Sequence, residues 1–438
     1  MNSIELTNQR AVVQARGVDE PEEEGLTEHH LEPTDRGPAA WRLLCLTFIF
    51  ESLFWGLLLS FGVFQDYYSQ QPQFADNRYI AVVGTVASSI SYLGAPFITP
   101  FIKRYQRFQH KMIWCGWLIC ISGVALASFC DTVKTLILTQ GVAYGIGFLI
   151  FYFPILSMVN EYWIARRGMA YGLLCSSSGA SGAFMPFVIQ ELLDRYGYRT
   201  TLRALAMALF VLTGPLIPFL RGRLPLSSQT ALARPDWGFL RNTLFWIYSV
   251  SNIAQGLGYF FPSLFLPSYV TSLGLSSKYG GLLLALMNIS QVLGQLTFGS
   301  LSDRNLPLSV LTAVSLATAG TAALALWGLA TSLPLLIVFA LVYGFFAAGY
   351  TAMWARMTTA VTSDPLTVPF VFGLFNFGKG IGNVLAGPIS SNLLFSATSA
   401  ESYGLAKYMP LIVFTGCSMI FGSLTMGLRH ARISHWIG

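Results

Sequence analysis

The sequence has little charge, few histidines and no paired cysteine spacing. Only 11% of its 438 residues are Asp, Glu, Lys or Arg, whereas soluble globular proteins carry about 25%. Four of the five histidines lie in the terminal segments, and we identify neither a convincing Ser/His/Asp set nor a Walker-type phosphate loop. These deficits argue against a soluble enzyme, and we expect no catalytic residue and no cofactor.

All six cysteines lie in or at the edge of apolar runs, without a Cys-x-x-Cys spacing and without a nearby histidine. This pattern predicts packing residues, with no metal site and no disulfide framework. The N-terminal segment also lacks the basic start and the apolar stretch of a cleaved secretory signal. We expect this polar, acidic segment to stay attached and to be disordered.

Acidic residues are concentrated at the N-terminus, where nine of the 20 fall within the first 40 residues. From Trp41 onward the formal charge is +12. A nucleic-acid-binding protein would gather Lys and Arg on one patch of a soluble body, whereas here they are scattered between apolar runs. We therefore expect these residues in loops at a membrane face, with the lipid bilayer as partner and no nucleic acid bound.

Twelve apolar runs are long enough to cross a membrane, because a hydrocarbon core about 30 Å thick needs about 20 helical residues. Gly and Pro within some runs do not argue against spans, since neighbouring helices satisfy the freed backbone groups. The sequence predicts an all-α integral membrane protein with twelve transmembrane helices in two six-helix bundles. The predicted spans are 43–64, 80–102, 112–130, 136–159, 169–189, 202–220, 244–270, 279–300, 308–330, 333–354, 368–394 and 409–428.

The loop charges predict the orientation, because basic residues accumulate on the cytoplasmic side. With the N-terminus inside, 18 Lys and Arg lie on the inner side and seven on the outer side, while Lys379 lies within a span. Both termini are therefore predicted to be cytoplasmic. We expect the plasma membrane, with a vacuolar or other internal membrane as the alternative.

The longest internal hydrophilic link separates the sixth span from the seventh. Two short matches indicate an internal duplication: the segment at Gly172 recurs at Gly373, and the turn at Lys103 aligns with Asp303, at offsets of 201 and 200 residues. Duplicated halves around a mid-membrane site are typical of secondary transporters. The expected organisation is an acidic tail at 1–40, an N-terminal bundle at 41–222, a linker at 223–241, a C-terminal bundle at 242–430 and a tail at 431–438.

The turn after the eighth span, Gly299-Ser300-Leu301-Ser302-Asp303-Arg304, resembles the G-x-L-x-D-R signature of the major facilitator superfamily. The resemblance implies that Gly299, Asp303 and Arg304 belong to a gating motif that supplies a charge interaction at a helix end. The equivalent turn of the first half departs from the pattern. It has Thr99 at the place of the glycine and Lys103 at the place of the acid.

Two longer segments resemble the fungal monocarboxylate-transporter-like branch of that superfamily. One comprises residues 35–37, 40–41 and 60–68, with Arg36 where the branch has glycine. The other comprises residues 162–172 and continues to Gly179 and Gly182. This second segment contains Arg166 and Arg167 at the cytoplasmic start of the fifth span. We assign both to the conformational or gating set and expect them to anchor the helix and set the topology, with substrate contact as the alternative.

The charged substrate groups of animal monocarboxylate carriers are missing. Those carriers place a lysine in the first span, and an acid and an arginine in the eighth. Here Leu59 falls at the place of the lysine, and Gln291 and Gln295 fall at the places of the acid and the arginine. A buried carboxylate without a cationic partner is costly, so lactate-type recognition by that mechanism is not expected.

Polar side chains inside spans are costly unless partnered, which makes them functional candidates. Three stripes follow the spacing i, i+3, i+7, which keeps side chains on one helix face. Bonding between helices is the alternative role for their amides. The stripes, and the predicted substrate contacts, are Asn252, Gln255 and Tyr259; Asn288, Gln291 and Gln295; and Asn376, Lys379 and Asn383.

Lys379 is a cation in an otherwise uncharged run, and Glu51 is the only acid deep within a span. We expect Lys379 to bind an anionic group of the substrate, to pair with Glu51, or to extend toward water. Glu51 is a candidate for proton coupling, since burial raises the pKa of a carboxyl. A neutral, hydrogen-bonded acid or an ion pair is the alternative for Glu51.

The sequence favours a carrier that moves a small organic solute by alternating access, acts as a monomer and is driven by a proton or solute gradient. Export of a hydrophobic or weakly acidic metabolite, such as a secondary metabolite, is preferred over proton-coupled uptake of a monocarboxylate or another small organic acid. A receptor or sensor that uses the same fold without transport is the alternative class. An intramembrane enzyme ranks third, because the spans contain no catalytic constellation.

Overall fold

The computed structural model describes residues 32–74, 79–223, 236–304, 306–364, 367–395 and 406–437. Within these ranges the chain is helical and contains no strand. The predicted N-terminal tail up to residue 31, linker residues 224–235 and Gly438 lie outside the described residues.

The first half of the chain forms the elements α2 (Pro38–Leu59), α3 (Phe61–Ser69), α4 (Ile80–Leu93), α5 (Ala95–Arg104), η1 (Gln106–Phe108), α6 (Gln109–Ala127), α7 (Val133–Leu136), η2 (Ile137–Ala143), α8 (Tyr144–Tyr162), α9 (Arg167–Thr213) and η3 (Gly214–Phe219). The second half forms η5 (Trp237–Arg241), α10 (Thr243–Tyr259), α11 (Phe261–Ser272), α12 (Ser277–Ser302), α13 (Leu308–Thr321), η6 (Ala322–Trp327), α14 (Leu333–Ala352), α15 (Trp354–Val361), α16 (Val368–Phe395), η7 (Ala406–Tyr408) and α17 (Met409–Ile437).

Nine helical runs among the described residues are long and apolar enough to cross a membrane, and α4 with α5 makes a tenth, bent by 48°. The longest run, Arg167–Phe219, contains two of the predicted spans. It reverses at Gly197, whose φ of 72° is not helical and which glycine adopts without strain. The helices α10 and α11, joined at Phe260, occupy the predicted seventh span.

Contacts with α6 show the reversal at Gly197. The hydroxyl of Tyr198 donates a hydrogen bond to the Cys130 carbonyl just past the end of α6. At the end of α9, Thr213 accepts a hydrogen bond of 2.7 Å from the indole N–H of Trp117, in the middle of α6. The second part of α9 therefore runs antiparallel to α6.

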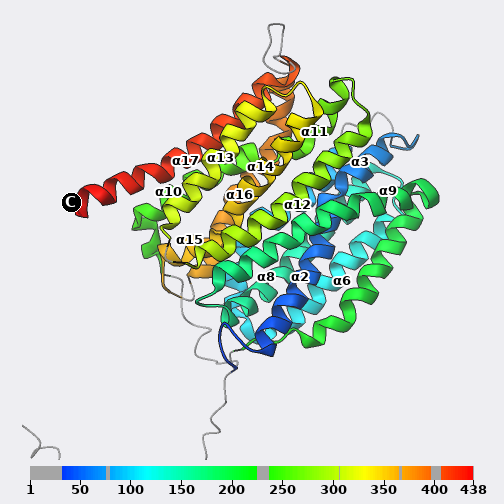
Figure 1. Ribbon diagram of the computed structural model, residues 1–438. Helices are drawn as coiled ribbons and strands as arrows, with labels where there is room; N and C mark the ends of the chain where they lie inside the picture. Colours follow the sequence, from blue (N-terminus) through cyan, green and yellow to red (C-terminus); the bar gives the residue numbers. More distant parts are fainter. Residues whose placement is uncertain are drawn as a thin grey trace, which may run out of the picture. The chain divides into compact units, whose positions relative to one another are not determined.

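Two hydrophobic cores hold the helices. One is built from residues between Ala39 and Leu220 together with Ala355, and the other from residues between Phe239 and Met426. Helices of different halves also touch. The helix α12 lies along α9 (Figure 1), and α16 packs on α4 and α5. The residues considered below lie at or near these contacts between the halves.

Candidate functional site

Lys379 lies in the middle of α16 with its ammonium group among aromatic rings. Its Nζ is 3.8 Å from the ring centre of Tyr259, 5.4 Å from that of Trp354 and 5.8 Å from that of Phe260. The side chain is only 5% exposed, so it does not extend to water. The electron-rich faces of the rings attract a cation by about 2 kcal/mol or more when water is excluded.

Breaks in two helices place these rings. The turn between α10 and α11 lies at Phe260, two residues before Pro262 in the first turn of α11. Proline has no backbone N–H with which to continue the preceding helix. The turn between α14 and α15 lies at Met353, directly before Trp354. Discontinuous helices near the middle of the membrane commonly border the substrate site of a transporter.

Glu51 of α2 is 5% exposed, and its Oε2 has no hydrogen-bond partner among the described residues. The hydroxyl of Tyr152 hydrogen-bonds to its side chain. None of the ion pairs in the described part of the chain includes Glu51 or Lys379. The thiol of Cys175 lies within electrostatic range of both groups, so the acid and the lysine face one central region without pairing.

The four asparagines of the three stripes make hydrogen bonds to neighbouring groups. Asn288 of α12 donates to the Gly182 carbonyl of α9 at 3.0 Å, and Asn383 of α16 donates to the Ser88 hydroxyl of α4 at 2.8 Å. Asn252 donates to the Phe375 carbonyl, and Asn376 donates to a carbonyl of its own helix. These contacts match the alternative role of amides as bonds between helices or within one.

The three glutamines differ from the asparagines. Gln255 is fully buried and donates to the Ala347 carbonyl at 3.4 Å, while its Oε1 has no partner among the described residues. Gln295 is 3% exposed, and its Oε1 is likewise unpartnered there. Gln291 is partly exposed. Among the stripe residues, Lys379 therefore supplies a charge to the central region and Tyr259 supplies an aromatic ring.

Asp303 joins the second bundle to the start of α9. Its carboxylate accepts hydrogen bonds from the backbone N–H groups of Gly168 at 2.8 Å and Met169 at 2.7 Å. Arg356 of α15 lies 3.6 Å away. A carboxylate at a helix N-terminus interacts favourably with the unpaired N–H groups and the helix dipole. Burial raises the pKa of Asp303, whereas these hydrogen bonds and Arg356 act in the opposite direction.

The rest of the predicted gating motif surrounds this contact. A Cβ at Gly299 would come within 2.6 Å of the Gly168 carbonyl, so glycine is required for α12 to approach α9. Arg167 donates to the carbonyls of Trp163 and Asn160 and thus anchors the end of α8. Arg166 and Arg304 are exposed.

Asp35 is a contact residue whose role was not predicted. Its carboxylate accepts hydrogen bonds from the backbone N–H groups of Ile164, Ala165 and Arg166, which lie just before α9. The two segments that resemble the monocarboxylate-transporter-like branch therefore meet in space. The Asp35-Arg36-Gly37 pattern was visible in the sequence, but nothing there indicated its partner.

The family model described as Major Facilitator Superfamily matches residues 40–319 and 248–433. The chain belongs to this superfamily. Its structure is similar to that of the human organic anion transporter MFSD10, with a TM-score of 0.64, 15% identity and coverage of 89% of this chain and 100% of that one. The transporter FucP gives a TM-score of 0.62 at 13% identity, with coverage of 89% and 99%. The predicted fold is confirmed, and the protein is a multi-pass membrane transporter.

The curated relatives agree with the predicted branch. The MFS-type transporter pynF of Aspergillus niger is 26% identical over 390 residues, which cover 89% of each chain. The aspyridones efflux protein apdF of Emericella nidulans is 25% identical, with 84% of this chain and 73% of that one covered. Human monocarboxylate transporter 12 is also 25% identical, with 84% and 75% covered.

Proposed function

We propose that this transporter exports a hydrophobic, weakly acidic metabolite from the cytosol by alternating access. The observation that carries the proposal is Lys379, a buried cation enclosed by aromatic rings and without an acidic partner among the described residues. A carboxylate or another acidic group of the solute would supply the missing countercharge. The rings of Tyr259, Phe260 and Trp354 would contact its apolar body.

The energetic argument rests on the cost of a buried charge. An ammonium removed from water loses several kcal/mol of solvation, and the ring contacts offset only part of this loss. An anionic solute therefore gains more from this site than a neutral solute of the same shape. Export agrees with the names of relatives such as the aspyridones efflux protein.

Uptake of a monocarboxylate, coupled to a proton, is the second candidate. The likeness to monocarboxylate transporter 12 favours it, and Glu51, buried with an unpartnered Oε2, is the group that would carry the proton. The neutral residues Leu59, Gln291 and Gln295 at the places of the charged groups argue against the recognition mechanism of animal carriers. We also propose that both termini are cytosolic, on the basis of the loop charges.

The test uses naphthoate, a hydrophobic acid, and naphthamide, its neutral counterpart, as solutes. Inside-out vesicles from a yeast host expressing the protein should accumulate naphthoate above the level of control vesicles. The variant Lys379→Gln should reduce this accumulation at least about tenfold, equivalent to about 1.4 kcal/mol. Naphthamide transport should change less than about twofold, because the amide side chain keeps hydrogen bonding but loses the charge.

Two control variants separate charge from structure. Lys379→Arg keeps the cation and should retain the preference for naphthoate over naphthamide. Lys278→Gln removes an exposed lysine outside this site and should not change transport of either solute. Equal losses for naphthoate and naphthamide in Lys379→Gln would contradict an anion site. Ligand binding without flux in the wild-type protein would favour the receptor or sensor instead.

A further inference from the structure

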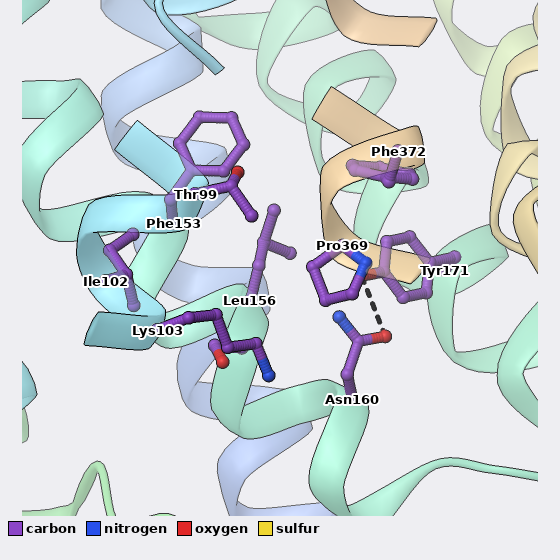
Figure 2. A pocket seen from close by; sticks show the side chains of 10 residues that line it. Thr99, Ile102, Lys103, Phe153, Leu156, Asn160, Tyr171, Pro369 and Phe372 are labelled. Carbon is purple, nitrogen blue, oxygen red and sulfur yellow. Dashed lines mark hydrogen bonds between the residues drawn. The ribbon is translucent and has the colours of Figure 1, made fainter. Parts of the chain in front are cut away.

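A small cavity lies where the two bundles meet, at the same end of the molecule as Asp303. The cavity has a volume of about 20 Å³, which is enough for one water molecule. Figure 2 shows side chains from both bundles around it. The lining residues are Thr99, Ile102, Lys103, Phe153, Leu156, Ser157, Asn160, Tyr171, Pro369 and Phe372.

Three polar groups of this cavity can donate hydrogen bonds to a bound anion. The Ser157 hydroxyl is buried, at 6% residue exposure, and has no partner among the described residues. The Oδ1 of Asn160 already accepts a hydrogen bond of 3.1 Å from the Tyr171 hydroxyl, which leaves its NH₂ group (Figure 2). Lys103 adds an ammonium with three donors. No lining residue carries a carboxylate, so the cavity suits an anion.

Lys103 occupies the place that corresponds to Asp303 in the other half. Asp303 bonds the start of α9 across the two bundles. At the start of α16 a backbone N–H group is bonded by a nearby residue instead: Asp364 accepts a hydrogen bond of 3.0 Å from the Thr367 N–H. Among the described residues, no hydrogen bond gives Lys103 the helix-capping role that Asp303 has at α9, and a cation at a helix N-terminus would be unfavourable. A structural role at the gate therefore does not account for Lys103.

The charged groups around Lys103 do not prevent it from binding an anion. Glu161, Asp364 and Arg167 all lie within electrostatic range. The carboxylate of Glu161 accepts a hydrogen bond of 2.8 Å from the Arg223 backbone N–H, and Asp364 binds Thr367 as described. Both acids are thus engaged with backbone donors outside the cavity lining, while Arg167 adds a second positive charge.

We propose that this cavity is an anion-binding subsite that receives the acidic group of the transported solute at the cytosolic gate, before the solute reaches Lys379. The inference rests on the proposed export of a weak acid and names the site of first capture. Pro369 and Phe372 belong to one bundle and the other lining residues to the opposite one. Separation of the bundles would therefore enlarge the cavity and admit more than a single water molecule.

The first experiment measures occupancy without transport. In a chain whose six native cysteines are replaced by alanine, Ser157→Cys provides a thiol in the cavity that a maleimide can label. Naphthoate should slow this labelling at least about threefold, and naphthamide should not. Lys103→Gln should abolish the protection, whereas Lys103→Arg should keep it. Lys111→Gln, which removes an exposed lysine at the same end, is the matched control and should keep it as well.

The second experiment measures transport into inside-out vesicles with intact cysteines. Lys103→Gln should raise the KM for naphthoate about tenfold and leave naphthamide unchanged. If this variant fails to fold, Asn160→Asp places a carboxylate in the cavity and should raise the same KM. Unchanged naphthoate KM in both variants, or equal effects of Lys103→Gln and Lys111→Gln, would overturn the subsite.

The outcomes also separate this inference from the proposed function. Protection by naphthoate that depends on Lys103, without any transport, would support the subsite and contradict export. Transport that depends on Lys379 but not on Lys103 would support export and contradict the subsite. Equal protection by acetate at the same concentration would assign the cavity to small free anions and overturn its role in solute capture.

Discussion

Neutralising Asp303 should open the contact between the bundles. The variant Asp303→Asn keeps one oxygen that can accept a hydrogen bond but loses the negative charge. The wild-type carboxylate accepts two short backbone hydrogen bonds, from Gly168 and Met169. A hydrogen bond to a charged group contributes about 1.5–3 kcal/mol. The variant loses one such bond and weakens the other.

The structure sets the expected size of the effect. Arg356 lies 3.6 Å from Asp303 and is partly exposed, so this ion pair adds at most about 1 kcal/mol. Burial raises the pKa of Asp303, which means that desolvation offsets part of the gain. We therefore expect a loss of about 2 kcal/mol, equivalent to a change of about 30-fold in the ratio of closed to open molecules.

Labelling of Cys175 measures this ratio. A chain that keeps Cys175 and has the other five cysteines replaced by alanine is labelled with an impermeant maleimide in inside-out and right-side-out vesicles. Asp303→Asn should accelerate labelling from the proposed cytosolic side about 30-fold, because Cys175 lies within electrostatic range of both Glu51 and Lys379. Asp131→Asn, which affects an exposed ion pair with Arg199, is the control and should have no effect.

A change of less than about threefold in correctly folded Asp303→Asn would refute this reasoning, as would equal acceleration from both sides. The first result would mean that other contacts, such as that of Asn288 with Gly182, hold the bundles together. The second would mean that the variant loosens the whole protein.

Three further changes follow from the same structure. Asp35→Ala should remove three hydrogen bonds to backbone N–H groups and lower the Tm by several degrees in a thermal-unfolding assay, whereas Asp66→Ala, at an exposed site, should not; equal Tm values would argue against a holding role for Asp35. Gly382→Ala should reduce folded yield, because its Cβ would lie 2.1 Å from the Gly256 backbone, while Gly387→Ala on the same helix meets nothing within 4 Å and should be tolerated; similar yields would show that α10 and α16 can separate. Glu51→Gln should abolish solute accumulation driven by a pH gradient but preserve solute exchange, with Glu191→Gln at an exposed site as the control; unaltered accumulation would remove Glu51 from the coupling mechanism.

The all-helical fold and the positions of the long apolar runs were predictable, because each span must satisfy its own backbone hydrogen bonds in lipid. The breaks were harder to predict. Pro262 indicates why α11 starts where it does, but the interruption at Met353 has no comparable residue. Trp354 was therefore assigned to the end of a span, and its place beside Lys379 could not be anticipated.

Partners of buried polar groups were the least predictable part of the site. The spacing i, i+3, i+7 places Asn252, Gln255 and Tyr259 on one face of a helix, yet it does not identify the neighbour that faces them. Asn252 bonds the carbonyl of Phe375 from a helix more than 100 residues away. Lys379 was distinguishable in the sequence from the other stripe residues only by its charge, which a neighbouring amide cannot balance.

The two lysines suggest how one acidic group could move through the protein without being trapped. Phe372, which lines the cavity with Lys103, and Lys379 lie seven residues apart on α16, about two turns or 10 Å along one helix face. At each position one ammonium offers charge, and neither is paired with an acid among the described residues. The ammonium of a lysine binds a carboxylate more weakly than the bidentate guanidinium of an arginine, so the solute can leave each site. A double variant, Lys103→Arg with Lys379→Arg, should therefore bind naphthoate more tightly and release it more slowly, which would lower kcat together with KM; a raised kcat would contradict this account.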